Sequence, residues 1–163
     1  MTTTDLNLRT IQPADDPQVK QLVINTLKEF GAVGPGYASS DTELDSMYEA
    51  YTGDDRVYFI LEREGQVVGG AGIGPLKKST GSTCELQKMY FDPSIRGEGW
   101  GKKLIQKCLD FAKESGYSQC YLETLPGMKP AQHLYSSFGF SYISERKGDT
   151  GHSGCHVFMM KTL

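Results

Sequence analysis

Seven stretches of the chain have the short apolar or alternating pattern that indicates β-strands. The stretches 57–62 and 66–73 are separated by a turn at Glu64–Gly65, which predicts a hairpin. The polar run 77–82 predicts a further turn before the next strand. The predicted strands lie at residues 6–11, 57–62, 66–73, 84–91, 119–125, 140–144 and 155–162.

Apolar residues at helical spacing predict four helices. The first follows a turn at 13–16, and the second is a short helix that Ser40 and Glu43 begin as a capping box and that ends near Tyr51. The third ends at Gly116 and the fourth at Gly139. The apolar positions are Val19, Leu22, Val23, Leu27 and Phe30 in the first helix, Leu104, Ile105, Cys108, Leu109, Phe111 and Ala112 in the third, and Ala131, Leu134, Tyr135 and Phe138 in the fourth.

Strands and helices are intermixed over 163 residues, a length that suits one domain with one core. We predict an α/β (α+β) fold with a mixed, mostly antiparallel sheet of about seven strands and about four helices, extending over 1–163. No apolar run reaches the ~20 residues needed to span a bilayer, and MTTTDLNLRT does not resemble a signal peptide. We therefore expect a cytoplasmic protein with no membrane partner and with reduced thiols at Cys84, Cys108, Cys120 and Cys155.

The charge distribution excludes some functions and favours others. A net charge of −3 argues against binding to nucleic acid, which usually needs a basic face. Residues 41–55 include six acids and no Lys or Arg, which indicates either a solvated helix face or a rim that attracts cations. His152, Cys155 and His156 are metal-ligating residue types, but no second cluster matches them, so no metal is expected.

The segment RGEGWG, residues 96–101, places three glycines between a predicted strand and a predicted helix. A helix start offers free N–H groups and the positive end of its dipole, and glycine lets the backbone approach a ligand closely. Arg96, Lys102 and Lys103 add positive charge. The segment therefore predicts a pyrophosphate site, with a tight connection that binds nothing as the alternative.

Two known phosphate-binding patterns fit this segment poorly. The phosphate-loop pattern of nucleoside triphosphatases does not match at Arg96, where it requires glycine, or at Lys103, where it requires Ser or Thr. The dinucleotide pattern fails once, at Lys102. Glu123 does lie near the end of the next strand, as that pattern requires, so an NAD-dependent oxidoreductase stays as the weaker alternative.

The segment does fit the pattern [QR]-x-x-G-x-[GA], and the residues around it extend the match. The run ELQKMYFDPSIRGEGWGKKLI, followed by YLETL, by A-x-x-LY at 131–135 and by FGF at 138–140, resembles the GNAT superfamily of acetyl-CoA-dependent N-acetyltransferases. The resemblance is strongest over 84–143, and the order of the earlier elements agrees with it. It implies transfer of an acetyl group from acetyl-CoA to a primary amine, on a small molecule or a peptide, by direct attack in a ternary complex. It also implies a possible homodimer, by analogy of fold.

The resemblance implies a binding role for two segments. In this family the amides of the glycine turn hold the CoA pyrophosphate, and the strand before the turn bulges, splays from its neighbour and pairs with pantetheine through its backbone. A backbone N–H of that strand would also polarise the thioester carbonyl. Met128 stands where many relatives have an Asn that touches pantetheine, so we assign it no such role. The implied residues are Met89, Tyr90 and Phe91 in the strand and Arg96, Gly97, Glu98, Gly99, Trp100, Gly101 and Lys102 in the turn.

The resemblance also suggests catalytic residues. Tyr135 matches the tyrosine that protonates the departing CoA thiolate, although its place on an apolar stripe leaves a packing role open. An alkylammonium must lose a proton before it attacks, and a carboxylate with a pKa of about 4.3 needs a raised pKa or a chain of water to accept that proton. Glu85 is the first candidate for this base and Glu123 the second. Because loops carry specificity, we expect the acceptor site between residues 30–51 and 146–156. A GNAT fold that senses acyl-CoA without turnover is a further alternative.

Overall fold

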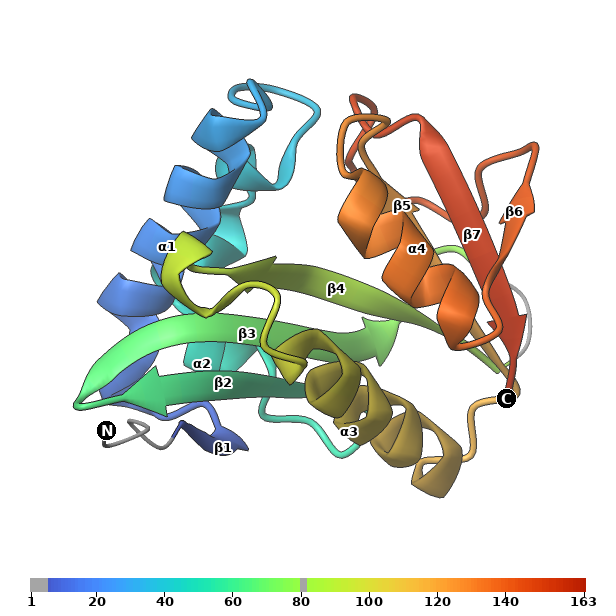
Figure 1. Cartoon of the computed structure of the whole chain (residues 1–163). Coiled ribbons are helices and arrows are strands. Elements are labelled where there is room, and N and C mark those ends of the chain that lie inside the picture. Colours follow the sequence, from blue (N-terminus) through green and yellow to red (C-terminus); the bar gives the residue numbers. More distant parts are fainter. Residues whose placement is uncertain (1–5, 80–81) are drawn as a thin grey trace.

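The computed structural model describes residues 6–79 and 82–163, and these residues form one seven-stranded sheet (Figure 1). The strand order is β1-β2-β3-β4-β5-β7-β6, and every pair is antiparallel except β4 with β5. This confirms the predicted mixed, mostly antiparallel sheet. The strands are β1 Asn7–Thr10, β2 Val57–Arg63, β3 Gln66–Pro75, β4 Thr83–Phe91, β5 Gln119–Thr124, β6 Ser141–Ile143 and β7 Val157–Thr162.

Two predictions reach beyond the described residues. The first five residues of the segment analysed for a signal peptide lie outside them, as do residues 80 and 81 of the turn predicted at 77–82. Among the residues that are described, no helix is long and apolar enough to cross a membrane.

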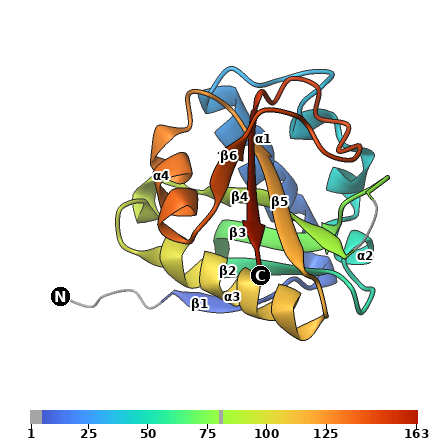
Figure 2. The same cartoon turned by 90° about the vertical axis from the view of Figure 1, so that its right-hand side faces the viewer.

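The helices cover both faces of the sheet (Figure 2). On one face, α1 (Asp16–Glu29) and α2 (Met47–Ala50) pack over a core that includes Tyr58 and Ile60. On the other, α3 (Trp100–Glu114) and the Tyr135 side of α4 (Lys129–Ser137) pack over the second core cluster. Five residues of the predicted apolar stripe of the third helix are buried there: Leu104, Ile105, Cys108, Leu109 and Ala112. The stripe of α1 stops short of Phe30, which lies past the helix end and is 39% exposed.

The second predicted helix is wrong as a continuous element. The segment instead forms two 3₁₀ turns, Ala38–Ser40 and Thr42–Asp45, and then the single turn of α2. The predicted capping box does not form, because the Glu43 carboxylate bonds to Lys88 of β4 instead of turning back to Ser40. The Tyr48 N–H at the start of α2 donates to the Asp16 carboxylate of α1, at 2.8 Å. Contacts with distant elements therefore divide this helix into short pieces.

Strand β4 bulges and then separates from β5. Opposite β3, Gly70 pairs with Tyr90 and Gly72 with Gln87, so β4 carries one extra residue between these pairs. Lys88 lies in this bulge, with φ of +48°. Strand β5 pairs with β4 only over 83–85, opposite 119–121. The bulge and the splay implied by the family resemblance are thus both present.

The alternation of β4 puts its acid and its thiol on opposite faces. Cys84 is buried in the α3-side core together with Cys108 and Cys120, whereas Glu85 faces a pocket on the other side. All four cysteines are free thiols, as predicted. The side chain of Cys84 is therefore directed away from the surface on which Glu85 lies.

Candidate active site

Two pockets lie along the splay between β4 and β5. The first, here called the glycine-turn pocket, has a cavity volume of about 580 Å³, and the second, the polar pocket, about 180 Å³. They meet at Met89, Tyr90 and Met128, which line both. The predicted residues that line the glycine-turn pocket are Met89, Tyr90, Phe91, Arg96, Gly97, Gly99, Trp100, Gly101 and Lys102. Those that line the polar pocket are Glu85, Glu123 and Tyr135, with Met89 and Tyr90.

Free backbone N–H groups gather at the glycine turn. Gly97 and Gly99 have φ of +79° and +86°, which L-residues rarely adopt, and Gly99 is the N-cap of α3. Within the described residues, the N–H groups from Gly97 to Gly99 donate to no acceptor. Those of the first helical residues, 100–102, have no intrahelical acceptor either, because the ladder starts with Lys103 donating to Gly99. The turn is thus able to hold an anion.

The charge of Arg96, which was expected to add to this anion site, is paired with an acid in the structure. Its guanidinium donates to both carboxylate oxygens of Glu29, at 2.6 and 3.0 Å, and to the carbonyl of Phe91. Its own N–H donates to the carbonyl of Pro93. Arg96 lines the pocket, and its positive charge is compensated by an acid 67 residues away in the chain.

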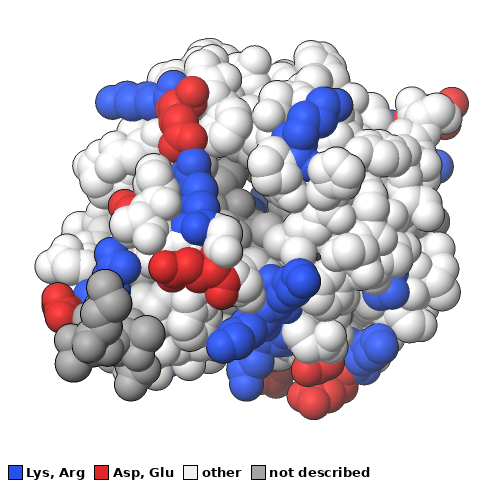
Figure 3. Space-filling model, viewed as in Figure 1, with Lys and Arg blue, Asp and Glu red and all other residues white. Residues whose placement is uncertain are grey.

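The remaining charges around the turn are mixed. Lys103 lies over the ring of Trp100, 4.3 Å from its centroid, and Glu98, one of the predicted residues, does not line the pocket. On the face that carries the turn, acidic and basic side chains are interspersed, and basic ones border a hollow near its centre (Figure 3). The pocket below the turn is mostly apolar and includes Phe30, Ile95 and Leu134.

Glu85 is a buried acid with a raised pKa. Burial raises the pKa of its carboxyl to about 7, and the nearby charge of Glu123 acts in the same direction. A hydrogen bond from Gln87 Nε2, at 2.7 Å, and the charge of His152 offset part of this rise. Its second oxygen, Oε2, has no hydrogen bond within the described part of the chain. Such a group exchanges a proton near neutral pH.

Glu123 is held by its neighbours. The Tyr121 hydroxyl donates to one carboxylate oxygen at 2.5 Å, and the Thr150 hydroxyl donates to the other at 2.6 Å. The Arg146 Nε lies 3.4 Å from the first oxygen. The side chain is almost fully buried. The two candidate acids therefore differ, since Glu85 has one bonded oxygen and Glu123 has both in use.

Tyr135 is at once a core residue and a pocket residue. Its ring packs edge-on against Phe140, with centroids 6.0 Å apart, and belongs to the α3-side core. Its hydroxyl makes no hydrogen bond to any described residue, although the side chain lines the polar pocket. Burial raises the pKa of this hydroxyl well above its usual value, so it stays protonated and able to donate.

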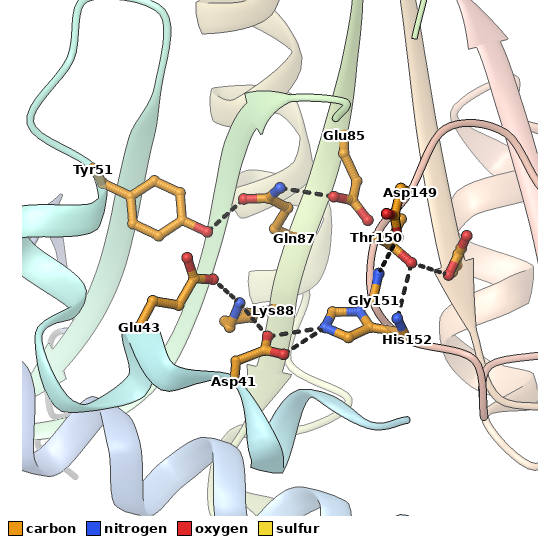
Figure 4. Close-up of polar contacts among 11 residues, drawn as sticks. Asp41, Glu43, Tyr51, Glu85, Gln87, Lys88, Asp149, Thr150, Gly151 and His152 are labelled. Carbon is orange, nitrogen blue, oxygen red and sulfur yellow. Dashed lines mark hydrogen bonds and ion pairs between the residues drawn. The ribbon is translucent and has the colours of Figure 1, made fainter. Parts of the chain in front are cut away.

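Four charged or polar side chains join distant segments beside Glu85 (Figure 4). Lys88 forms ion pairs with Asp41, at 2.9 Å, and with Glu43, and only 3% of its side chain is exposed. His152 Nε2 lies 2.9 and 3.0 Å from the Asp41 carboxylate oxygens. Burial would raise the pKa of Asp41, but the bond from His152 and the charge of Lys88 outweigh it, and the pKa is lowered.

Ion pairs within the structure involve four of the six acids in residues 41–55. Asp41 and Glu43 are paired with Lys88, Asp45 with Lys20, and Asp55 with Arg56. Lys88 and Lys20 come from other elements, so the sequence around Asp41, Glu43 and Asp45 does not show them, whereas Arg56 directly follows Asp55. Over residues 6–79 and 82–163, no group of His, Cys, Asp and Glu has a metal-binding arrangement, and His152 is bonded to Asp41.

The structure brings together pocket residues that the sequence did not single out. The segments expected to form the acceptor side do line the polar pocket, through Tyr37, Asp41 and Glu43 on one side and Thr150 and His152 on the other. Gln87 and Lys88 were missed. Their only local signal is the alternate glycines Gly70, Gly72 and Gly74 on β3, which leave space on the facing strand.

Comparison with known proteins settles the family. A profile described as "Acetyltransferase (GNAT) family" matches residues 24–140. The chain belongs to the GNAT acetyltransferase family. It is 41% identical over 157 residues to an uncharacterized N-acetyltransferase of Escherichia coli K12, YjgM, covering 96% of this chain and 94% of the relative. It is 30% identical over 124 residues to the N-alpha-acetyltransferase RimI of Mycobacterium tuberculosis, covering 76% and 72%.

Solved GNAT structures share the fold. An acetyltransferase of this family from Staphylococcus aureus Mu50 superposes with a TM-score of 0.82 at 20% identity, covering 98% of this chain and 99% of the other. A putative acetyltransferase of Salmonella typhimurium, yncA, was solved with acetyl-CoA and superposes with a TM-score of 0.76 at 22% identity, covering 97% and 94%. The GNAT chain described here is thus an N-acetyltransferase with the family's fold.

Proposed function

We propose that this N-acetyltransferase transfers the acetyl group of acetyl-CoA to a primary amine by direct attack in a ternary complex. Glu85 is the base and Tyr135 the acid. The observation that carries the proposal is the junction of the two pockets at Met89 and Tyr90. The apolar glycine-turn pocket ends at free backbone amides. At the junction it meets the polar pocket, which contains the buried acid Glu85 and the free hydroxyl of Tyr135.

The glycine-turn pocket fits CoA in three respects. The free N–H groups from Gly97 to Lys102 and the dipole of α3 suit the pyrophosphate. The apolar walls suit pantetheine. Beyond Glu85, the β5-facing edge of β4 pairs with no strand in the described residues, so its backbone is available to a bound chain. Two related folds, one from Salmonella typhimurium and one from Thermoplasma acidophilum, were solved with acetyl-CoA and with coenzyme A.

The chain's residues divide the proton transfers between them. Glu85 accepts a proton from the alkylammonium, and the nitrogen of the neutral amine then forms a bond to the thioester carbonyl carbon. Backbone N–H groups near Met89 stabilise the negative charge that develops on the carbonyl oxygen. Tyr135 gives its proton to the thiolate as the carbon–sulfur bond breaks, and the second proton that the nitrogen loses restores the Tyr135 hydroxyl. The pKa of Glu85 is about 7. It is therefore about 2.5 units closer to the pKa of an alkylammonium than the pKa of an ordinary carboxylate is.

The acceptor is a primary amine on a small molecule or a peptide. Relatives whose names state an acceptor include a thialysine N-epsilon-acetyltransferase of Bos taurus and the N-alpha-acetyltransferase RimI. The polar pocket of this chain carries both signs of charge, because Lys88 neutralises part of its acidic lining. An acceptor that itself combines an amine with another polar group fits this lining better than a purely cationic amine.

The test is release of free thiol from acetyl-CoA with a panel of amines, measured for the wild type and for Tyr135→Phe. We expect thiol release that depends on the amine and falls at least tenfold in Tyr135→Phe. A protein that only senses acyl-CoA would bind CoA and release no thiol with any amine. Thermal unfolding separates the oxidoreductase alternative, because acetyl-CoA and CoA, but not NAD, should raise the midpoint. At ~100 times Kd the stabilisation is ~2.7 kcal/mol.

A further inference from the structure

We propose that Gln87 is a positioning residue for the reaction and that Tyr51 fixes its orientation. Gln87 holds one oxygen of the Glu85 carboxylate and leaves the other free for the amine. The proposal rests on Glu85 as the base, as proposed above. Its evidence is a chain of two hydrogen bonds that ends at Glu85 (Figure 4).

The two bonds give the Gln87 amide a single favourable orientation. The Tyr51 hydroxyl donates to Gln87 Oε1 at 2.5 Å, and Gln87 Nε2 donates to Glu85 Oε1 at 2.7 Å. Burial, and then the nearby carboxylates, raise the pKa of Tyr51 well above 10, so its hydroxyl remains a donor. The reverse orientation would place the amide oxygen against the ionised carboxylate, two acceptors face to face. Tyr51 therefore directs the amide N–H toward Glu85.

Tyr51 is itself held rigidly. It follows α2, is buried, and packs against Tyr58 with ring centroids 5.3 Å apart. The Tyr58 hydroxyl donates to the carbonyl of Lys88, in the bulge directly after Gln87. Both tyrosines thus contact the same part of β4. Tyr51 bonds to the side chain of Gln87, and Tyr58 bonds to the backbone of Lys88.

Strand β3 leaves space for this arrangement. Gly72 pairs with Gln87 and Gly74 with Glu85. A Cβ at Gly72 would come within 2.7 Å of Tyr58 and 3.1 Å of Tyr51, and a Cβ at Gly74 within 3.0 Å of Gln87 Oε1. Three glycines at alternate positions, 70, 72 and 74, therefore accommodate the two tyrosines and the amide. This explains a glycine pattern in which none of the three requires a positive φ.

The bond from Gln87 has a chemical consequence. An N–H donor stabilises the ionised carboxylate, so it keeps the pKa of Glu85 from rising as far as burial alone would take it. Because Oε1 is occupied, the free Oε2 is the oxygen that accepts the proton. Loss of the amide should both raise the pH at which the base becomes active and loosen the carboxylate.

The test is the pH profile of kcat/KM for Gln87→Met, which matches the side chain in length and removes the donor. In the wild type, kcat/KM should rise with pH through about 7, as Glu85 ionises. In Gln87→Met this rise should move upward by about one pH unit, the size expected for a lost hydrogen bond to a charged group. Gln119→Met, the same substitution on β5 outside both pockets, should leave the profile unchanged.

Two further variants keep the test decisive. Tyr51→Phe removes only the hydroxyl that orients the amide and should move the rise in the same direction by a smaller amount. If Gln87→Met does not fold, Tyr51→Phe decides, and an unmoved profile there overturns the proposal. Gly74→Ala, whose Cβ displaces the amide, should behave like Tyr51→Phe.

The outcomes separate this proposal from the proposed function. A folded Gln87→Met enzyme whose kcat/KM falls equally at every pH would show that Gln87 is only structural, and the positioning role would be lost while Glu85 stays the base. A Glu85→Gln enzyme that keeps the rise near pH 7 would show that Glu85 is not the base. In that case the proposed function fails first, and the role of Gln87 fails with it.

Discussion

The glycine-turn pocket and the polar pocket lie on either side of Met89 and Tyr90, yet they are built differently. The first offers mainly backbone: free N–H groups, glycines with positive φ and the start of α3. All of these come from one short segment. The second offers side chains from β4, β5, the 3₁₀ turns and the loop before β7, which lie up to 111 residues apart in the chain.

This difference determines what each pocket tolerates. A site made of backbone depends on the φ angles that its residues can adopt. A methyl group added to a glycine can therefore disrupt the site, whereas truncation of a nearby side chain need not. A site made of paired side chains depends on each partner, because removal of one leaves another buried without its counterpart. The predictions below test this contrast, beginning with the largest effect.

The largest effect is expected at Glu85 of the polar pocket. Glu85→Gln removes the proposed proton acceptor, and kcat/KM should fall by about 10²–10⁴-fold and lose its rise near pH 7. The unfolding midpoint should not fall, because a buried carboxyl with a raised pKa holds its proton more tightly folded than unfolded and so destabilises the protein once ionised. Kinetics across pH and thermal unfolding together check this.

Glu123→Gln is the matched control for Glu85→Gln. Tyr121 and Thr150 donate to different oxygens of Glu123, and the Gln amide replaces one of these oxygens with a donor, so the variant should lose about 1–3 kcal/mol of stability. Its pH profile should keep the rise near 7. If instead Glu123→Gln removes that rise and Glu85→Gln does not, the base has been assigned to the wrong acid.

The next effect is on stability, at Lys88. Lys88→Met leaves Asp41 and Glu43 without their buried cation. We expect the free energy of unfolding to fall by about 3 kcal/mol, the lower end of the range for a broken buried pair, because the Glu43 carboxylate can turn toward water. Burial alone would lower the pKa of Lys88, but Glu43 and Asp41 raise it. The contribution is therefore present at neutral pH and is lost only as pH rises past the ordinary Lys value and through the raised one.

Lys20→Met provides the comparison for Lys88→Met, since Lys20 pairs with Asp45 at the surface. Its effect should stay below about 0.5 kcal/mol. Thermal unfolding at neutral pH measures both variants. Equal decreases in the midpoint would mean that the cluster around Lys88 is no more than a surface ion pair.

A smaller effect is expected at the glycine turn. Gly99→Ala introduces a Cβ at φ of +86°, which costs about 1–2 kcal/mol, although the space around it is open. If this strain is relieved by moving the turn, affinity for CoA should fall by about 5–30-fold, as measured by titration calorimetry. Lys102→Ala, which removes one exposed charge and no backbone group, should change affinity less. The reverse order would show that the pocket depends on side-chain charge.

The smallest effect is expected at Glu29, which binds the Arg96 guanidinium. Glu29→Gln frees a positive charge at the edge of the pocket and should lower the KM for acetyl-CoA by about 2–5-fold, because an exposed ion pair contributes only about 0–1 kcal/mol. The gain should diminish at high salt. A KM that increases would mean that the pair itself shapes the binding surface.

The sequence predicted what local residues determine. The apolar periods of β2 to β5 and of α3, and the positive φ values of the turn, follow from neighbours in the chain, so the sheet and the glycine turn were predictable. The segment 38–50 was not, because Lys88 and Asp16 bind its residues from outside. The ion pair of Arg96 with Glu29 was not predictable for the same reason, since Glu29 is 67 residues away.

Between the two acids, the sequence ranked Glu85 above Glu123 by resemblance alone. What distinguishes them physically is the number of donors around each carboxylate, and these donors come from Tyr121, Thr150 and Gln87. Thr150 belongs to a loop whose position only the folded chain determines. The alternate glycines of β3 were visible from the start, but their meaning depends on which strand lies opposite.

The short seam between β4 and β5 has a mechanical consequence. Among the described residues, only three residue pairs, 83–85 with 119–121, join strands β1–β4 to strands β5–β7, so the sheet has the form of a wedge and Glu85 occupies the last rung at its vertex. When the arms of a wedge move apart, points at the vertex are displaced least. If β1–β4 and β5–β7 move apart to admit a bulky acyl chain, the ends of β4 and β5 far from the seam would thus move much more than Glu85 does.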